Sequence, residues 1–144
     1  MDATAGFTSI DESTIARLVD AFYAKVRRNP ALAPVFAAKI ADDAWPVHLQ
    51  RMYAFWSSVM LTSGRYKGDP VAVHKRVAGI DFPLFDTWLD LFEATAAELF
   101  VPPLAEQFAV KARRIAESLR LALFFRPTEA WTEDLRQRPP LVAH

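Results

Sequence analysis

Cysteine is absent from the 144 residues of the chain, and its absence excludes disulfides, thiolate chemistry and cysteine-ligated zinc or iron–sulfur sites. Histidine, with three copies, is then the only soft nitrogen donor available to a metal ion. A charge excess is missing as well, because seventeen basic residues balance seventeen acidic ones. Without a net positive field the chain does not attract a phosphate backbone, so nucleic acid is not an expected partner.

Long apolar runs are also missing. The first residues, MDATAGFTSIDE, contain neither the basic nor the apolar region of a signal peptide. No apolar run approaches the roughly 20 residues that a membrane-spanning helix needs. We therefore expect a cytoplasmic protein without a membrane span.

The length suits one domain with a single hydrophobic core, which we place at residues 1–126. The remaining residues, 127–144, mix prolines with charged side chains and show no sustained period. We expect this C-terminal tail to be extended or loosely docked.

What the chain does have is apolar residues at helical spacing, and no stretch alternates with the period of a strand. The spacing predicts an all-α fold. Ser9 and Glu12 have the spacing of a capping box and are expected to begin the first helix. The expected helices cover residues 10–28, 43–61, 70–78, 83–99 and 104–123, with one or two short turns in 31–40.

Four side chains on different predicted helices could form a site. His48 lies on the apolar stripe of its helix, and His74 lies on a short helix that Pro70 opens. Tyr23 and Trp88 lie on the apolar sides of two further helices. Taken singly, each also has an ordinary explanation, because histidine, tyrosine and tryptophan in a core often pair with a nearby carbonyl.

Together, two imidazoles, a phenol and an indole fit a haem pocket better than the other sites we considered. A structural zinc site needs four ligands, and a hydrolase needs a nucleophile with oxyanion donors. A porphyrin needs one imidazole for its iron, an apolar slot, cations for two propionates and a pocket on the other face. The alternative is a cofactor-free helical interaction module in which the same residues are part of the core.

Several separated motifs resemble, in the right order, the truncated haemoglobins of group III. They are FYAKVRRNPALAPVF at 22–36, WPVH and FWSSVML within 45–61, YKGDPVAVHK at 66–75 and FPLFDTWLDLF at 82–92. The similarity covers about residues 10–125. It implies a two-over-two helical sandwich, the truncated globin fold, that encloses a b-type haem (iron protoporphyrin IX). The tail is longer than the family core requires.

The resemblance implies a role for each residue that matches a family position. His74 resembles the proximal ligand of the iron, and Tyr23 and Trp88 resemble the distal hydrogen-bond donors. His48 resembles the distal histidine of several members, and Met52 occupies the apolar position above the iron.

Further positions are expected to hold the cofactor. Phe36 resembles the aromatic residue that stacks on the porphyrin, and Arg51 occupies the position of a basic residue that pairs with a propionate. Phe55, His48 and Trp88 are also expected to contact the haem. From the residues alone, a plain core aromatic is the better explanation of Phe36, and an arginine at the margin of a helix, such as Arg51, is usually a solvated cation.

The family implies a protein that reversibly binds O2 and other diatomic ligands such as NO and CO. Two donors would hold O2 too long for easy delivery, so NO dioxygenation or peroxidase-like chemistry with an unidentified reductase are the activities to test. Whether the protein is an enzyme stays open at this stage.

Overall fold

The computed structural model describes residues 6–70 and 82–124. Within these two ranges there is no strand, and Phe7 and Phe100 form an isolated bridge. The expected all-α class is therefore confirmed. The predicted short helix that carries His74 and the C-terminal tail lie outside the described residues. The described helices are α1 Glu12–Val26, α2 Ala33–Lys39, the 3-10 turn η1 Asp42–Ala44, α3 Trp45–Leu61, α5 Phe82–Leu99 and α6 Pro102–Phe124.

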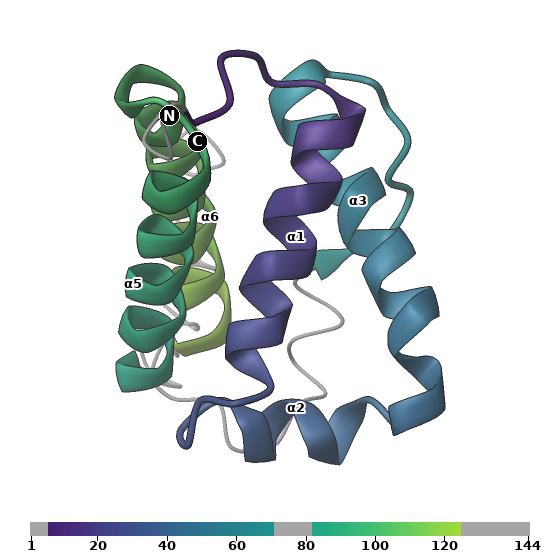
Figure 1. The fold of residues 1–144 in the computed structure, drawn as a ribbon. Coiled ribbons are helices and arrows are strands. Elements are labelled where there is room, and N and C mark those ends of the chain that lie inside the picture. Colours follow the sequence, from purple (N-terminus) through teal and green to yellow (C-terminus); the bar gives the residue numbers. More distant parts are fainter. Residues whose placement is uncertain (1–5, 71–81, 125–144) are drawn as a thin grey trace, which may run out of the picture.

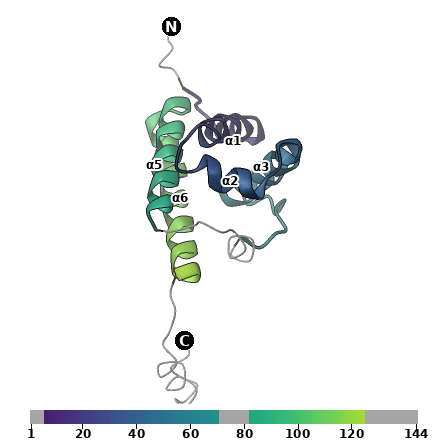
Figure 2. The ribbon, with the colours of Figure 1, turned by 90° about the horizontal axis from the view of Figure 1, so that it is seen from below.

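The helices form two layers of two. Helices α5 and α6 pack along each other in one layer, and α1 and α3 pack together in the other (Figure 1). Helix α1 joins the layers because it also packs on α5. The short helix α2 crosses one end of the bundle between α1 and α3, as Figure 2 shows. None of the described helices has the length and apolarity to cross a membrane.

Helix α1 begins with a capping box that differs from the expected one. The Thr14 backbone N–H donates to the Asp11 carboxylate at 2.9 Å, and the Asp11 N–H donates to the Thr14 hydroxyl at 2.9 Å. These residues satisfy two amides that a helix start leaves open, so the prediction that Ser9 and Glu12 do so was wrong. The backbone hydrogen bond from Thr14 lowers the pKa of the Asp11 carboxyl.

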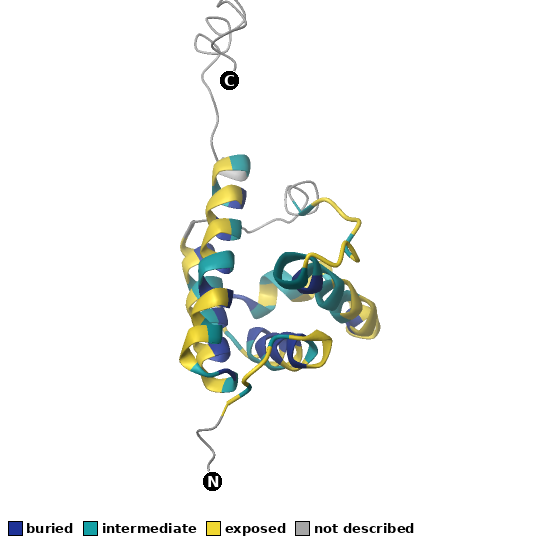
Figure 3. Ribbon diagram, turned by 90° about the horizontal axis from the view of Figure 1, so that it is seen from above, coloured by how far each residue is buried: buried dark blue, intermediate teal, exposed yellow. Residues whose placement is uncertain are grey.

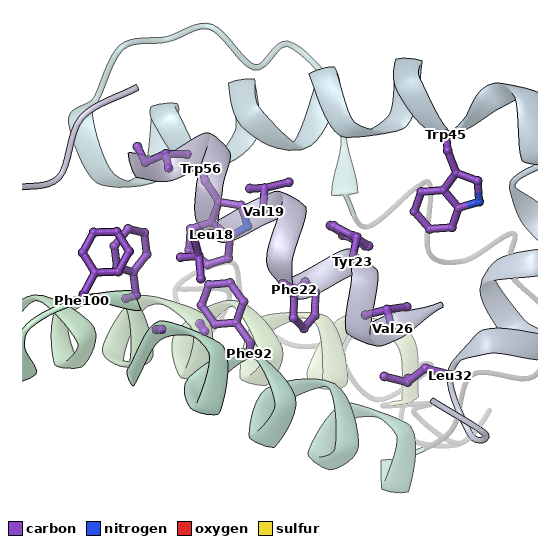
Figure 4. Packing of buried hydrophobic residues seen from close by; sticks show 14 residues of the cluster. Leu18, Val19, Phe22, Tyr23, Val26, Leu32, Trp45, Trp56, Phe92 and Phe100 are labelled. Carbon is purple, nitrogen blue, oxygen red and sulfur yellow. The ribbon is translucent and has the colours of Figure 1, made fainter. Parts of the chain in front are cut away.

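Helix α1 supplies the centre of the core. Its apolar stripe, which includes Leu18, Phe22 and Val26, is almost fully buried between α3 and α5 (Figures 3 and 4). Helix α3 also carries an apolar stripe, but among its residues only Trp45, Trp56 and Ser57 are fully buried. Apart from Pro46 and Val47, which are exposed, the rest of its apolar side chains are half-buried. A helix with such a stripe normally packs it against the core, so the half-buried side chains point to a hollow beside α3.

The loop after α3 is tied back to the helix by hydrogen bonds. The buried Ser57 hydroxyl donates to the Glu12 carboxylate at 2.6 Å and also pairs with the Ser63 hydroxyl at 2.7 Å. Further along, the Tyr66 backbone N–H donates to the Ser58 hydroxyl at 2.9 Å. These bonds hold Tyr66 beside the hollow.

Candidate functional site

A cavity of about 340 Å³ lies between the α2 and α3 side of the molecule and the α5 and α6 side. Its walls are mainly aliphatic and aromatic, and a few polar groups converge on it. Both the volume and the lining are typical of a pocket that binds a small molecule or a cofactor.

The predicted site residues that the structure describes all line this one cavity. They come from α1, α2, α3 and α5, so residues as far apart in sequence as Tyr23 and Trp88 meet at one place. His74 lies outside the described residues. The predicted residues on the cavity wall are Tyr23, Phe36, His48, Arg51, Met52, Phe55 and Trp88.

One corner of the cavity is a cluster of rings around Tyr23. The Tyr23 ring meets His48 edge to face, with 5.0 Å between the ring centroids, and it meets Phe36 in the same way at 5.9 Å. Behind them, the buried Trp45 ring lies 5.7 Å from Tyr23 and 5.3 Å from His48. The guanidinium of Arg27 covers Trp45 at 4.6 Å from the ring centroid. Trp45 therefore buttresses two cavity residues without lining the cavity itself.

The Tyr23 hydroxyl is suited to act as a hydrogen-bond donor. Burial raises the pKa of this phenol well above its usual value, so the group stays protonated at any physiological pH. Burial is the only cause of that shift, with no hydrogen bond from this hydroxyl to another described residue. A cavity-lining hydroxyl with no partner among the described residues favours the functional explanation of Tyr23 over a purely structural one.

Positive charge gathers at the mouth of the cavity. Arg51 and Lys39 are both exposed and both line the opening, whereas no carboxylate belongs to the described part of the lining. The chain as a whole is neutral, so the excess of positive charge in the described lining is a local feature of the site. Two cations at the rim of an apolar slot can pair with the carboxylates of an amphipathic ligand.

Tyr66 is a further polar residue of the wall. Burial raises the pKa of its hydroxyl, the charge of Asp69 adds to the shift, and Arg51 opposes it. Gly68 leaves room for this ring, because a Cβ at position 68 would collide with the Tyr66 hydroxyl. A larger residue at position 68 would therefore push Tyr66 out of place.

Sequence reasoning did not name several further cavity residues, among them Lys39, Trp56 and Tyr66. A signal existed for each of these three. Lys39 lies three residues after Phe36 on the same helix, which places both side chains on one face. Trp56 and Tyr66 lie inside the two motifs that carried the family resemblance.

Comparisons with known proteins agree with this architecture. No family model matches the chain. The crystal structure of a group III truncated haemoglobin from Campylobacter jejuni superposes on it with a TM-score of 0.79 and 29% sequence identity, covering 83% of this chain and 95% of the other. A curated relative, the group 3 truncated haemoglobin ctb of the same organism, is 29% identical over 120 residues, which is 82% of this chain and 94% of the relative. The chain therefore resembles the group III truncated haemoglobins over more than four fifths of its length and has their fold.

The similarity to this family agrees with the two layers of helices. The α1 and α3 pair faces the α5 and α6 pair, which is the expected two-over-two sandwich. The cavity lies inside that sandwich rather than on the outer surface of one layer. Within its described lining, Lys39 and Arg51 are the exposed residues.

Proposed function

We propose that this protein binds a b-type haem in the cavity, that His74 ligates the iron, and that the loaded protein reversibly binds O2, NO and CO. The observation that carries the proposal is the convergence of all the described site residues on one apolar cavity. Residues chosen from separate sequence motifs would not meet in this way if each were an unrelated member of the core.

The lining fits the chemistry of a porphyrin. Phe55, Leu84 and Ile115 provide apolar walls for the ring from three helices. Arg51 and Lys39 stand at the rim, where propionates would emerge into solvent. The bound haem would supply the metal that takes up a diatomic ligand, and the neutral imidazole of His74 is the donor type that haem iron accepts.

The polar end of the cavity would act on the ligand. The phenol of Tyr23 and the indole of Trp88 are donors, and His48 lies edge to face against Tyr23. A hydrogen bond to a ligand that gains negative charge is stronger than one to a neutral ligand. We infer that such donors slow ligand release, by about tenfold for every ~1.4 kcal/mol that they contribute.

The absorption spectrum of the purified chain with added haemin tests the proposal directly. We expect an intense Soret band that shifts when the iron is reduced and again when CO is added. The competing hypothesis, a cofactor-free interaction module, predicts only the absorbance of the protein's aromatic residues plus that of free haemin. A titration without saturation at one haem per chain would exclude the proposed site.

An enzyme-like role has its own test. Donors aimed at bound O2 polarise it, which favours reaction with NO to form nitrate or, with peroxide, reductive cleavage. A reductase would have to restore the ferrous iron after each cycle. When the oxygenated protein is mixed with NO in a stopped-flow instrument, we expect it to decay rapidly and nitrate to form. Slow decay without nitrate would count against NO dioxygenation.

A further inference from the structure

We propose that Phe92, a residue that does not line the cavity, fixes the orientation of the Trp88 indole and thereby sets how strongly the pocket holds its ligand. Phe92 is a positioning residue in this view, because it acts only through Trp88. The consequence for ligand release rests on the proposed haem function. The consequence for the orientation of Trp88 does not.

The geometry around Trp88 is a stack of three nearly parallel rings. The Trp88 indole lies 5.6 Å from the Phe92 ring, centroid to centroid, at an angle of 4°. The Phe92 ring also lies 4.7 Å from the Trp56 indole, at 14°. Trp88 and Trp56 both line the cavity, whereas Phe92 does not and has no exposed surface. Phe92 therefore fills the space between two cavity residues.

The stack joins two helices across the core. Trp88 and Phe92 are four residues apart on α5, a spacing that puts side chains next to each other on a helix. Trp56 comes from α3, in the opposite layer. The edge of Phe22, on α1, closes the arrangement, with its ring 5.7 Å from Trp88 at 86° and 5.2 Å from Phe92 at 81°. Figure 4 shows Phe22 beside Phe92. Three helices thus limit the movement of one indole.

This packing matters because the cavity side of Trp88 offers little restraint. Trp88 is only half-buried, and its cavity face meets open volume rather than packed atoms. The stack and the edge contact with Phe22 are what hold the plane of the ring. If the Phe92 ring were removed, the indole could rotate into the vacated space, and its N–H would no longer have one direction.

Phe92→Leu tests the proposal, and Phe108→Leu is its matched control. Both phenylalanines are fully buried and both contact Trp56, but the contacts of Phe108 run to Phe100, Phe92 and Trp56 rather than to Trp88. The two substitutions should therefore have similar effects on unfolding. Phe92→Met, which also removes the ring but has a flexible, unbranched side chain that fills irregular gaps, replaces the leucine variant if that does not fold.

Proton NMR of the full chain reports the orientation of Trp88, with its resonances identified by their loss in Trp88→Phe. Nuclear Overhauser contacts of the Trp88 indole N–H report its direction, whereas the chemical shift alone does not, because deleting the Phe92 ring would move it downfield even if the indole stayed in place. Phe92→Leu should change these contacts, while Phe108→Leu should leave them as in the parent. The spectra are recorded with haem and CO and also without haem. Equal Trp88 contacts in the parent and in Phe92→Leu would overturn the proposal in either form.

Ligand release supplies the second measurement. Phe92→Leu should raise the O2 dissociation rate about three- to tenfold, and Phe108→Leu should change it less than about twofold. In a chain that already carries Trp88→Phe, adding Phe92→Leu should have no further effect, because the positioned group is gone. An equal increase in both backgrounds would show that Phe92 acts by general loosening and would refute its role through Trp88. Absence of haem binding would defeat the proposed function, while the haem-free spectra would still decide the orientation.

Discussion

Replacing His74 with alanine is expected to abolish stable haem binding. The bond from an imidazole nitrogen to iron is the only coordinate bond that the proposal assigns to the protein. Without it the haem would be held by apolar contacts and by the cations at the rim, Lys39 and Arg51. Changes to groups that merely support a metal ligand cost 10- to 100-fold in affinity, so loss of the ligand itself should speed haem loss by more than about 100-fold. Transfer of haemin to an excess of another apoglobin measures this rate.

His48→Ala is the matched control for that experiment. The same imidazole is removed, but from a residue on the cavity wall next to Tyr23 rather than from the proposed iron ligand. This variant should keep its haem. A His74→Gly chain should also regain its haem spectrum when free imidazole is added, since the small molecule can occupy the vacated ligand position. Equal loss of haem in the two alanine variants would show that His74 is not the ligand.

Tyr23→Phe should raise the O2 dissociation rate by about tenfold, which corresponds to the loss of one hydrogen bond to a partly charged ligand. The substitution removes only the hydroxyl, and the ring would keep its contacts with Phe36, Trp45 and His48. Because burial raises the pKa of this phenol, the parent protein carries the proton throughout the accessible pH range. Rapid mixing of the oxygenated protein with CO measures the rate.

Trp88→Phe removes the other donor and should have an effect in the same direction. Tyr53→Phe serves as the control for both, because the Tyr53 hydroxyl donates to Asp20 at 2.5 Å on the α1 and α3 surface and does not line the cavity. That control should release O2 at the parent rate. If Tyr23→Phe and Trp88→Phe also release O2 as slowly as the parent, the distal assignment is wrong.

Part of the candidate site could be predicted from the sequence. Helical spacing predicted that Tyr23, His48 and Trp88 lie on the apolar sides of their helices, and the family motifs predicted that they share a pocket. The structure places all three on the wall of one cavity. Spacing could not place Lys39 at the mouth or Trp45 behind the ring cluster, because those positions depend on how α2 and α3 meet at the corner of the bundle.

The sequence did not predict which residues cap the first helix. Two overlapping spacings, from Ser9 to Glu12 and from Asp11 to Thr14, could each begin α1. Both are compatible with the rule that a polar side chain caps an amide three residues later. In the structure the Asp11 carboxylate accepts the Thr14 N–H and caps the helix, and the Ser9 hydroxyl donates to Asp11 instead.

The residues alone were enough to predict an all-α chain with histidine as its only soft nitrogen donor, since both follow from composition and from a period within each helix. The tertiary structure decided where that chain is hollow. Helices α1 and α3 carry similar apolar stripes, yet α1 packs between two neighbours and is buried, while α3 faces the cavity and stays half-exposed. A stripe indicates which side of a helix avoids water, but the opposing helices determine whether that side meets packed atoms or open volume.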